Sequence, residues 1–205
     1  MLRTDSDKKL DQFKKYSSIP IINGLSPSSH PTQVLSDIFT IQEIKKKSIS
    51  KLKLCWIGDA NNNMMNSLVE ACIKFSVYLN IACPKSYQPN KKLISLIKKQ
   101  KGKIKIFNKK EIAIKNSDVV MTDKIISLND KVNKKKKLKS FKNFKVDTKT
   151  MNLAKKDAIF LHCLPRGNEV TEEVFLGKQS KVWQQALNRV YVQKSILLYC
   201  FGKLR

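Results

Sequence analysis

The chain lacks any apolar run long enough to cross a membrane. A spanning helix needs about 20 consecutive apolar residues, and charged or polar residues interrupt every apolar run of this 205-residue sequence well before that length. The N-terminal segment MLRTDSDKKLDQF also lacks the apolar core of a secretory signal. The sequence therefore predicts a protein without a membrane segment that functions in the cytoplasm.

The chain has few cysteines, and their spacing fits neither a disulfide framework nor a metal site. The five are odd in number, widely separated and without a CxxC pair: Cys55, Cys72, Cys83, Cys163 and Cys200. Scattered single cysteines are typical of free thiols in a reducing compartment. We therefore expect no metal ion and no cofactor.

Arginine is scarce in a chain that is otherwise very basic. The net charge of +25 would suit a nucleic-acid-binding protein, but only four of the 41 basic residues are arginines. Proteins that read phosphates and base edges favour arginine for its planar, bidentate guanidinium. The lysines are spread along the chain beside many Asn and Ile residues, as AT-rich codon usage would produce. A solvated lysine surface is the preferred interpretation, and a basic nucleic-acid-binding module stays as the alternative.

Short apolar runs alternate with longer amphipathic segments along the chain. The runs predict strands over residues 19–22, 52–57, 78–83, 104–107, 119–121 and 158–161. The segments between them predict helices over 32–47, 63–75, 91–101, 130–141, 148–154 and about 186–199. Strands that are apolar throughout and separated by helices indicate an α/β fold, a doubly wound parallel sheet. Ligands bind such a sheet beyond the carboxyl ends of its strands.

A polar segment, NGLSPSSHPTQ, stands at the start of the long predicted helix. His30 precedes Pro31, a residue suited to the first helical turn, and Gln33 lies in that same turn. A helix N-terminus with a histidine and an amide could bind an anion or a carbonyl group. The alternative is that His30 only caps the helix and that Gln33 lies on the surface.

Two further polar segments follow predicted strands. GDANNNMMNS has a single glycine and no GxGxxG pattern, which argues against a dinucleotide, whereas its asparagines suit an amino-acid ligand. Simple capping by Asn61 or Asn62 is the alternative. In TDKIISLND, Asp123 follows a strand and could bind an amine, with the Ser127 hydroxyl near it. An N-cap role for Asp123 is equally consistent with the pattern.

The segment AIFLHCLPRG places a histidine and a cysteine at the end of an apolar run. The pattern puts Cys163 at the carboxyl edge of the sheet, although an inert, buried thiol is the common role of such a residue. His162 and Cys163 are neighbours on an extended segment, so we expect their side chains to point to opposite faces. That arrangement does not favour a cysteine protease.

Taken together, these segments resemble the ornithine carbamoyltransferase family over essentially the whole chain. The resemblance is carried by HPTQVLSDIFTIQE, WIGDANNNMMNS, TDKIISL, HCLPRGNEVTEEVF and ALNRVYVQKSILL. It implies transfer of the carbamoyl group of carbamoyl phosphate to ornithine, which gives citrulline and phosphate in arginine biosynthesis. It also implies a homotrimer without a cofactor.

The resemblance assigns roles to matching residues. Cys163 would lie beside the substrate amine without forming a covalent intermediate. The implied carbamoyl-phosphate contacts are Arg3, His30, Gln33, Cys163, Leu164 and Arg189, of which Arg3, His30, Cys163 and Arg189 are the catalytic candidates. The implied ornithine contacts are Asn63, Asp123, Ser127 and Leu128.

The resemblance also divides the chain and shows what it does not contain. Residues 1–29 resemble a remnant of the carbamoyl-phosphate-binding domain, 30–48 the interdomain helix and 49–185 the ornithine-binding domain. Residues 186–205 resemble a C-terminal helix that packs back on the first domain. The family's S-T-R-T phosphate loop is absent from this sequence, and Pro27, Leu128 and Leu187 replace the usual Asp, Met and Glu.

The missing loop leaves three alternatives open. We expect an enzyme chain that a separately encoded N-terminal fragment completes, or an inactive remnant that at most binds ornithine, with the nucleic-acid-binding module as the third. In either of the first two cases the chain alone should turn over poorly. The long helix and the last helix should expose apolar faces that the absent part of the domain would bury.

Overall fold

The computed structural model describes residues 1–126 and 133–203, and its N-terminal part is a small unit of two strands and a helix. Strand β1 (Leu2–Arg3) pairs in parallel with β2 (Asn23–Leu25), and helix α1 (Asp7–Tyr16) connects them. The strand predicted over 19–22 was wrong, because the pairing begins at Asn23 instead. Pro20 has no backbone N–H to donate to a partner strand, and Ile19 is exposed.

The rest of the chain is built on a five-stranded sheet, which confirms the predicted parallel α/β fold. Its strands are β3 (Lys53–Ile57), β4 (Tyr78–Ala82), β5 (Ile104–Phe107), β6 (Val119–Thr122) and β7 (Ile159–His162). They lie in the order β5-β4-β3-β6-β7, and every neighbouring pair is parallel. The chain moves outward from β3 to β5 and then returns to the other side of β3. The strand order therefore reverses between β3 and β6.

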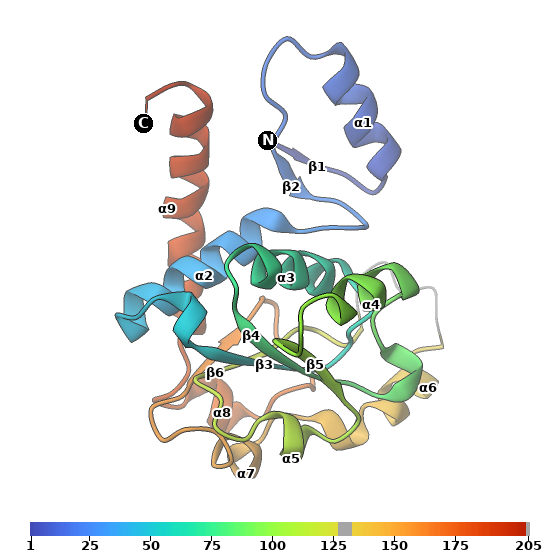
Figure 1. The fold of residues 1–205 in the computed structure, drawn as a ribbon, viewed down its shortest axis with the longest axis vertical. Coiled ribbons are helices and arrows are strands. Elements are labelled where there is room, and N and C mark those ends of the chain that lie inside the picture. The colour runs from blue at the N-terminus through green and yellow to red at the C-terminus, as the bar shows by residue number, and fades with distance from the viewer. Residues whose placement is uncertain (127–132, 204–205) are drawn as a thin grey trace.

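Helices cover both faces of this sheet (Figure 1). On one face lie α2 (Pro31–Lys45), α3 (Asn63–Lys74) and α4 (Lys91–Lys98). On the other lie α5 (Lys110–Ala113), α6 (Lys134–Ser140), α7 (Thr148–Met151) and α8 (Glu172–Leu176). Three short 3-10 turns complete the connections, at Ile49–Lys51, Lys85–Tyr87 and Lys142–Phe144.

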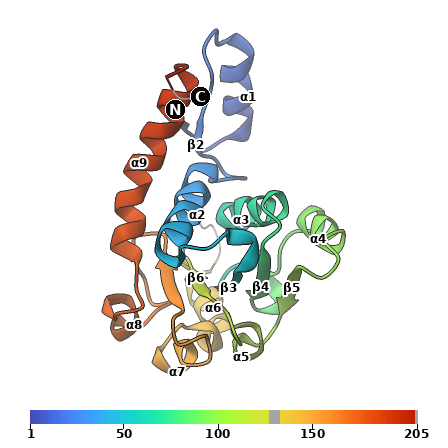
Figure 2. The same ribbon diagram turned by 60° about the vertical axis from the view of Figure 1, so that its left-hand side comes forward.

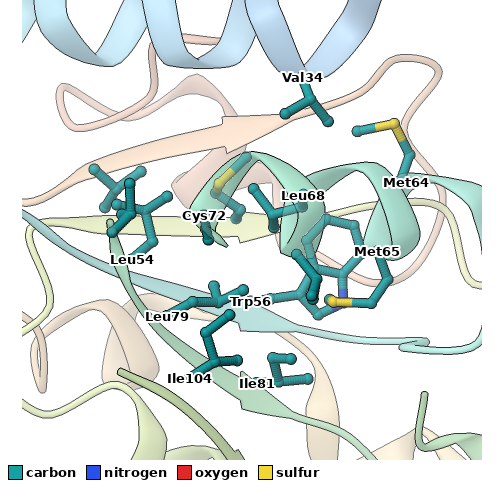
Figure 3. Close-up of a cluster of buried hydrophobic side chains, with 14 of the residues drawn as sticks. Val34, Leu54, Trp56, Met64, Met65, Leu68, Cys72, Leu79, Ile81 and Ile104 are labelled. Atoms are coloured by element: carbon teal, nitrogen blue, oxygen red, sulfur yellow. The ribbon is translucent and has the colours of Figure 1, made fainter. Parts of the chain in front are cut away.

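Alternate residues of each strand enter two separate hydrophobic clusters. Leu54 and Trp56 of β3 face the cluster beneath α2, α3 and α4, which Figure 3 shows. Cys55 and Ile57 of the same strand face the cluster on the opposite side. Strands buried on both faces have few polar positions, Asn80 of β4 being one, and this is why the apolar runs of the sequence located the sheet.

The last helix, α9 (Val182–Cys200), begins four residues before the predicted start at 186 and packs along α2 and β7. Its C-terminal half extends beyond the sheet toward the N-terminal unit (Figure 2). Seven large apolar side chains of α9 are exposed, in keeping with the predicted apolar face: Trp183, Leu187, Val190, Tyr191, Leu197, Leu198 and Tyr199. Within the described residues, none of the helices combines the length and apolarity that crossing a membrane requires.

Candidate active site

Three polar loops meet at the carboxyl edge of the sheet, around the point where the strand order reverses. Trp56 pairs with Met121 and Thr122 pairs with His162, so β3, β6 and β7 end at nearly the same level. The loop after β3 turns at Gly58, whose φ of +150° favours glycine. A Cβ there would also lie 3.2 Å from Thr122 Oγ1. This reversal point is where open α/β sheets bind ligands.

His30 enters the site from the N-terminus of α2. Its backbone N–H donates to Ser67 Oγ of α3 at 2.8 Å, and its side chain makes no capping hydrogen bond. His30 therefore occupies the N-cap position of α2, as the capping interpretation expected, and its imidazole is not used for that cap. Burial, followed by the positive charges of Arg189 and Arg3, lowers the pKa of His30 to about 4. The imidazole is neutral at pH 7, and two arginines from distant parts of the chain lie near it.

Gln33 is buried, which contradicts its interpretation as a surface residue. Its Nε2 donates to Asp37 Oδ1 at 2.9 Å, one helical turn further along α2. Gln33 also lines a cavity of about 170 Å³ together with Leu164, Gln185 and Arg189. The cavity thus lies between α2, α9 and the loop that follows β7.

His162 and Cys163 lie on opposite sides of the chain, as predicted. His162 Nε2 lies 2.8 Å from Glu169 Oε1, and its ring packs against Phe175 of the second cluster. Cys163 packs against the first cluster. Burial, together with the charges of Asp123 and Asp37, raises the pKa of Cys163 well above its usual value. A protonated thiol is a poor nucleophile, so the geometry disfavours covalent catalysis.

The loops after β3 and β6 each contribute a carboxylate, Asp59 and Asp123 respectively. Asp59 Oδ2 pairs with Lys137 Nζ at 2.7 Å, and both side chains are buried. In the part of the chain that the structure describes, Asp123 has no such ion pair, and its carboxylate accepts the Lys124 backbone N–H at 2.7 Å. Burial raises the pKa of Asp123 to about 6, because an ionised carboxylate loses hydration there. A ligand ammonium would supply the missing countercharge.

Asn63 joins the N-terminal part of the chain to this edge. Its Nδ2 donates to the Ser26 carbonyl at 2.9 Å, which leaves Oδ1 and the second N–H of Nδ2 for a ligand. Asn62 caps α3 by accepting the Met65 N–H at 2.8 Å, which confirms the capping interpretation for Asn62. Ser127 and Leu128 lie outside the described residues.

Four residues at the edge of the sheet were missed in the sequence. The spacing of Asp37, four residues after Gln33, is a signal that could have been used. The other three have no local signal: Glu169, Gln185 and Lys137. Lys137 lies in a lysine-rich helix that the sequence assigned to solvent, yet its side chain is only 6% exposed.

The fold and the site define a doubly wound α/β domain that places a neutral histidine and arginines at the same sheet edge as the Asp123 carboxylate, a group suited to a cation. Residues 50–200 match the Asp/Orn binding domain of the aspartate/ornithine carbamoyltransferases, and residues 1–43 match their carbamoyl-P binding domain. The chain belongs to the ornithine carbamoyltransferase family.

Individual relatives and solved structures agree with this family membership. The ornithine carbamoyltransferase of Caldicellulosiruptor saccharolyticus is 43% identical over 100% of this chain and 68% of its own length. That of Staphylothermus marinus is 40% identical over 96% of this chain and 65% of its own length.

The crystal structure of the anabolic enzyme from Campylobacter jejuni matches 98% of this chain and 68% of its own, with a TM-score of 0.90 and 39% identity. The enzyme from Pyrococcus furiosus matches 99% of this chain and 66% of its own, with a TM-score of 0.88 and 35% identity. The chain spans about two thirds of the length of these relatives.

Proposed function

We propose that this chain supplies the ornithine-binding part and the last part of the carbamoyl-phosphate-binding domain of an ornithine carbamoyltransferase. The complete enzyme would transfer a carbamoyl group from carbamoyl phosphate to ornithine. The observation that carries the proposal is the meeting, at one sheet edge, of two complementary groups. A neutral histidine with two arginines suits an anionic ligand, and the Asp123 carboxylate suits a cationic one.

Carbamoyl phosphate would bind on the α2 and α9 side. Arg3 and His30 would polarise the carbonyl oxygen, because a cation and a neutral N–H donor stabilise the negative charge that develops there. The positive charge of Arg189, which lies on α9, would offset the negative charge of the leaving phosphate. Gln33 and the Leu164 segment line the same cavity and would hold the carbamoyl end.

Ornithine would bind on the β3 and β6 side. Asp123 would pair with an ammonium group and Asn63 would offer Oδ1, with Ser127 and Leu128 completing the contacts. Cys163, whose thiol stays protonated, would pack beside the reacting amine. The neutral amine would attack the carbonyl carbon to form the new C–N bond, the bond from that carbon to the phosphate oxygen would break, and the proton lost by the amine would pass to the departing phosphate. The main contribution of the protein is to position both ligands.

We propose the corresponding division of the chain: 1–29 as the carbamoyl-phosphate-domain remnant, 30–48 as the interdomain helix, 49–185 as the ornithine-binding domain and 186–205 as the terminal helix. The two matched ranges, 1–43 and 50–200, support the boundary between the two domains at 48/49. The phosphate loop of the family is not in this sequence. Activity would therefore need a further carbamoyl-phosphate-domain segment, upstream in the same polypeptide or on a second one, and we expect a homotrimer in the complete enzyme.

The test is reconstitution with the N-terminal part of the Campylobacter jejuni enzyme that lies outside the matched region. Citrulline should form in the co-expressed mixture and not with this chain alone. Normal turnover by the chain alone would contradict the need for a further segment. A stable complex that forms no citrulline but binds ornithine would support the inactive-remnant alternative instead.

Ornithine binding by the chain itself is a separate test of the pocket. We expect D123N to weaken ornithine binding, measured by calorimetry, at least tenfold, because a charged pair becomes a neutral contact. The exposed Asp11 of α1 offers the matched control D11N, which should leave binding unchanged. Equal binding by D123N and the wild type would contradict the assigned role of Asp123.

A further inference from the structure

Asp37 is a fully buried carboxylate at the crossing of α2 and α9. Its Oδ1 accepts two hydrogen bonds, from Gln33 Nε2 at 2.9 Å and from Gln185 Nε2 at 2.7 Å. Gln33 precedes Asp37 on α2, whereas Gln185 belongs to α9 and is 148 residues away in the sequence. One oxygen atom thus accepts hydrogen bonds from two amide side chains that both line the cavity.

The connection continues to the end of β7. Gln185 Oε1 accepts the backbone N–H of His162 at 3.0 Å, immediately before Cys163. Arg189 follows Gln185 by four residues, so the two lie on the same face of α9. Asp37 therefore links three of the elements that carry the proposed carbamoyl-phosphate contacts, namely α2, α9 and the segment after β7.

The hydrogen bond to Asp37 also fixes which end of the Gln33 amide points into the cavity. An amide has a donor end and an acceptor end, and a carboxylate accepts hydrogen bonds. With the NH₂ group held by Asp37, Gln33 presents Oε1 to a ligand. A ligand with an N–H donor, as a carbamoyl group has, satisfies that oxygen. A methyl group in the same place would leave a buried acceptor without a partner.

We propose that Asp37 is a positioning residue that holds Gln33 with its acceptor toward the cavity and, through Gln185, sets α9 and the end of β7 around the same ligand. This role rests on the proposed function, and Asp37 itself need not touch the substrate. It makes Asp37 a determinant of selectivity for a transferred group that carries an NH₂.

The first test uses the chain alone and reads the Gln33 amide by NMR. In the wild type, the Gln33 side-chain NH₂ protons should show nuclear Overhauser contacts to the Asp37 β-protons and slow exchange with water. D37L, which removes the acceptor at similar volume, should speed that exchange at least tenfold. Absence of the contacts in the wild type would overturn the proposal, whether or not D37L folds.

A matched control lies at the same helix crossing. Glu43 Oε2 accepts from Gln184 at 3.2 Å and from Asn188 at 2.8 Å, and Glu43 does not line the cavity. E43L should disturb the packing of α2 on α9 without changing exchange at Gln33. If exchange of the Gln33 NH₂ protons were accelerated equally in D37L and E43L, Asp37 would act only through general packing, and the proposal would be overturned.

The second test uses the chain completed with the Campylobacter jejuni segment. D37L should lower kcat/KM for carbamoyl phosphate about 10- to 100-fold, the range expected from displaced binding groups. KM for ornithine should stay within about twofold of the wild-type value, and D37N, which keeps an acceptor oxygen, should recover most of the loss. Wild-type kinetics in D37L would overturn the proposal. A completed wild-type chain without activity would refute the proposed function, and the amide measurement would still decide the role of Asp37.

Discussion

Replacing Asp37 by asparagine should change how the stability of the protein depends on pH. Burial, opposed by hydrogen bonds from Gln185 and Gln33, raises the pKa of Asp37 from 3.8 to about 6. Its second oxygen, Oδ2, has no hydrogen-bond partner within the described residues and can take up the proton. The folded protein therefore binds a proton at a higher pH than the unfolded chain does. Folding therefore favours the protonated, uncharged form of the Asp37 side chain.

The sign and size of the effect follow from this difference. As pH falls through about 6, the folded state takes up a proton that the unfolded chain takes up only near 4, so wild-type stability rises in that window. A difference of about two pKa units corresponds to about 3 kcal/mol, at about 1.4 kcal/mol for each unit. D37N cannot titrate at this position. The free energy of unfolding of the wild type, minus that of D37N, should rise by about 2.5 kcal/mol between pH 7.5 and pH 4, because the unfolded chain is still partly ionised at pH 4.

Urea unfolding followed by tryptophan fluorescence at a series of pH values measures this difference. Arg189 of α9 and Asp123 after β6 also act on Asp37, but both remain in the variant and largely cancel in the subtraction. Ile41→Val is a control on the same helix, and it should cost about 1 kcal/mol equally at every pH. A wild-type-minus-D37N difference that stays flat across the whole range would refute the linkage and the burial that causes it.

Two further predictions concern buried polar groups and thiols. Glu169→Ala leaves His162 buried without its hydrogen-bond partner and should lower the free energy of unfolding by about 1–3 kcal/mol, measured by urea titration; no measurable loss would contradict the pairing. Burial raises the pKa of Cys55 and Cys72 to about 12, so neither should react with a thiol reagent in the folded protein. The half-buried Cys200 should react first, and C200S should remove the fast phase of the reaction; a fast phase that persists in C200S would contradict this.

The alternation of apolar runs and amphipathic segments was enough to predict the sheet, its parallel strands and most helices. It succeeded because strands buried on both faces and helices buried on one face leave different periods in the sequence. It was wrong at 19–22, where an apolar run contains a proline and lies outside any sheet. It also missed short elements such as α8, because four or five residues carry too little periodicity to be distinguished.

The sequence by itself also determined which residues stand at the carboxyl edge, because an edge residue is simply the next one after an apolar run. Asp123 and Cys163 were located in this way, and His30 was located by the proline that starts α2. Only the tertiary structure decided how distant residues meet there. The bond between Gln185 and Asp37 spans 148 residues, and the pair of Lys137 and Asp59 joins helix α6 to the loop after β3. Such contacts depend on strand order and on helix crossings, which local periodicity does not encode.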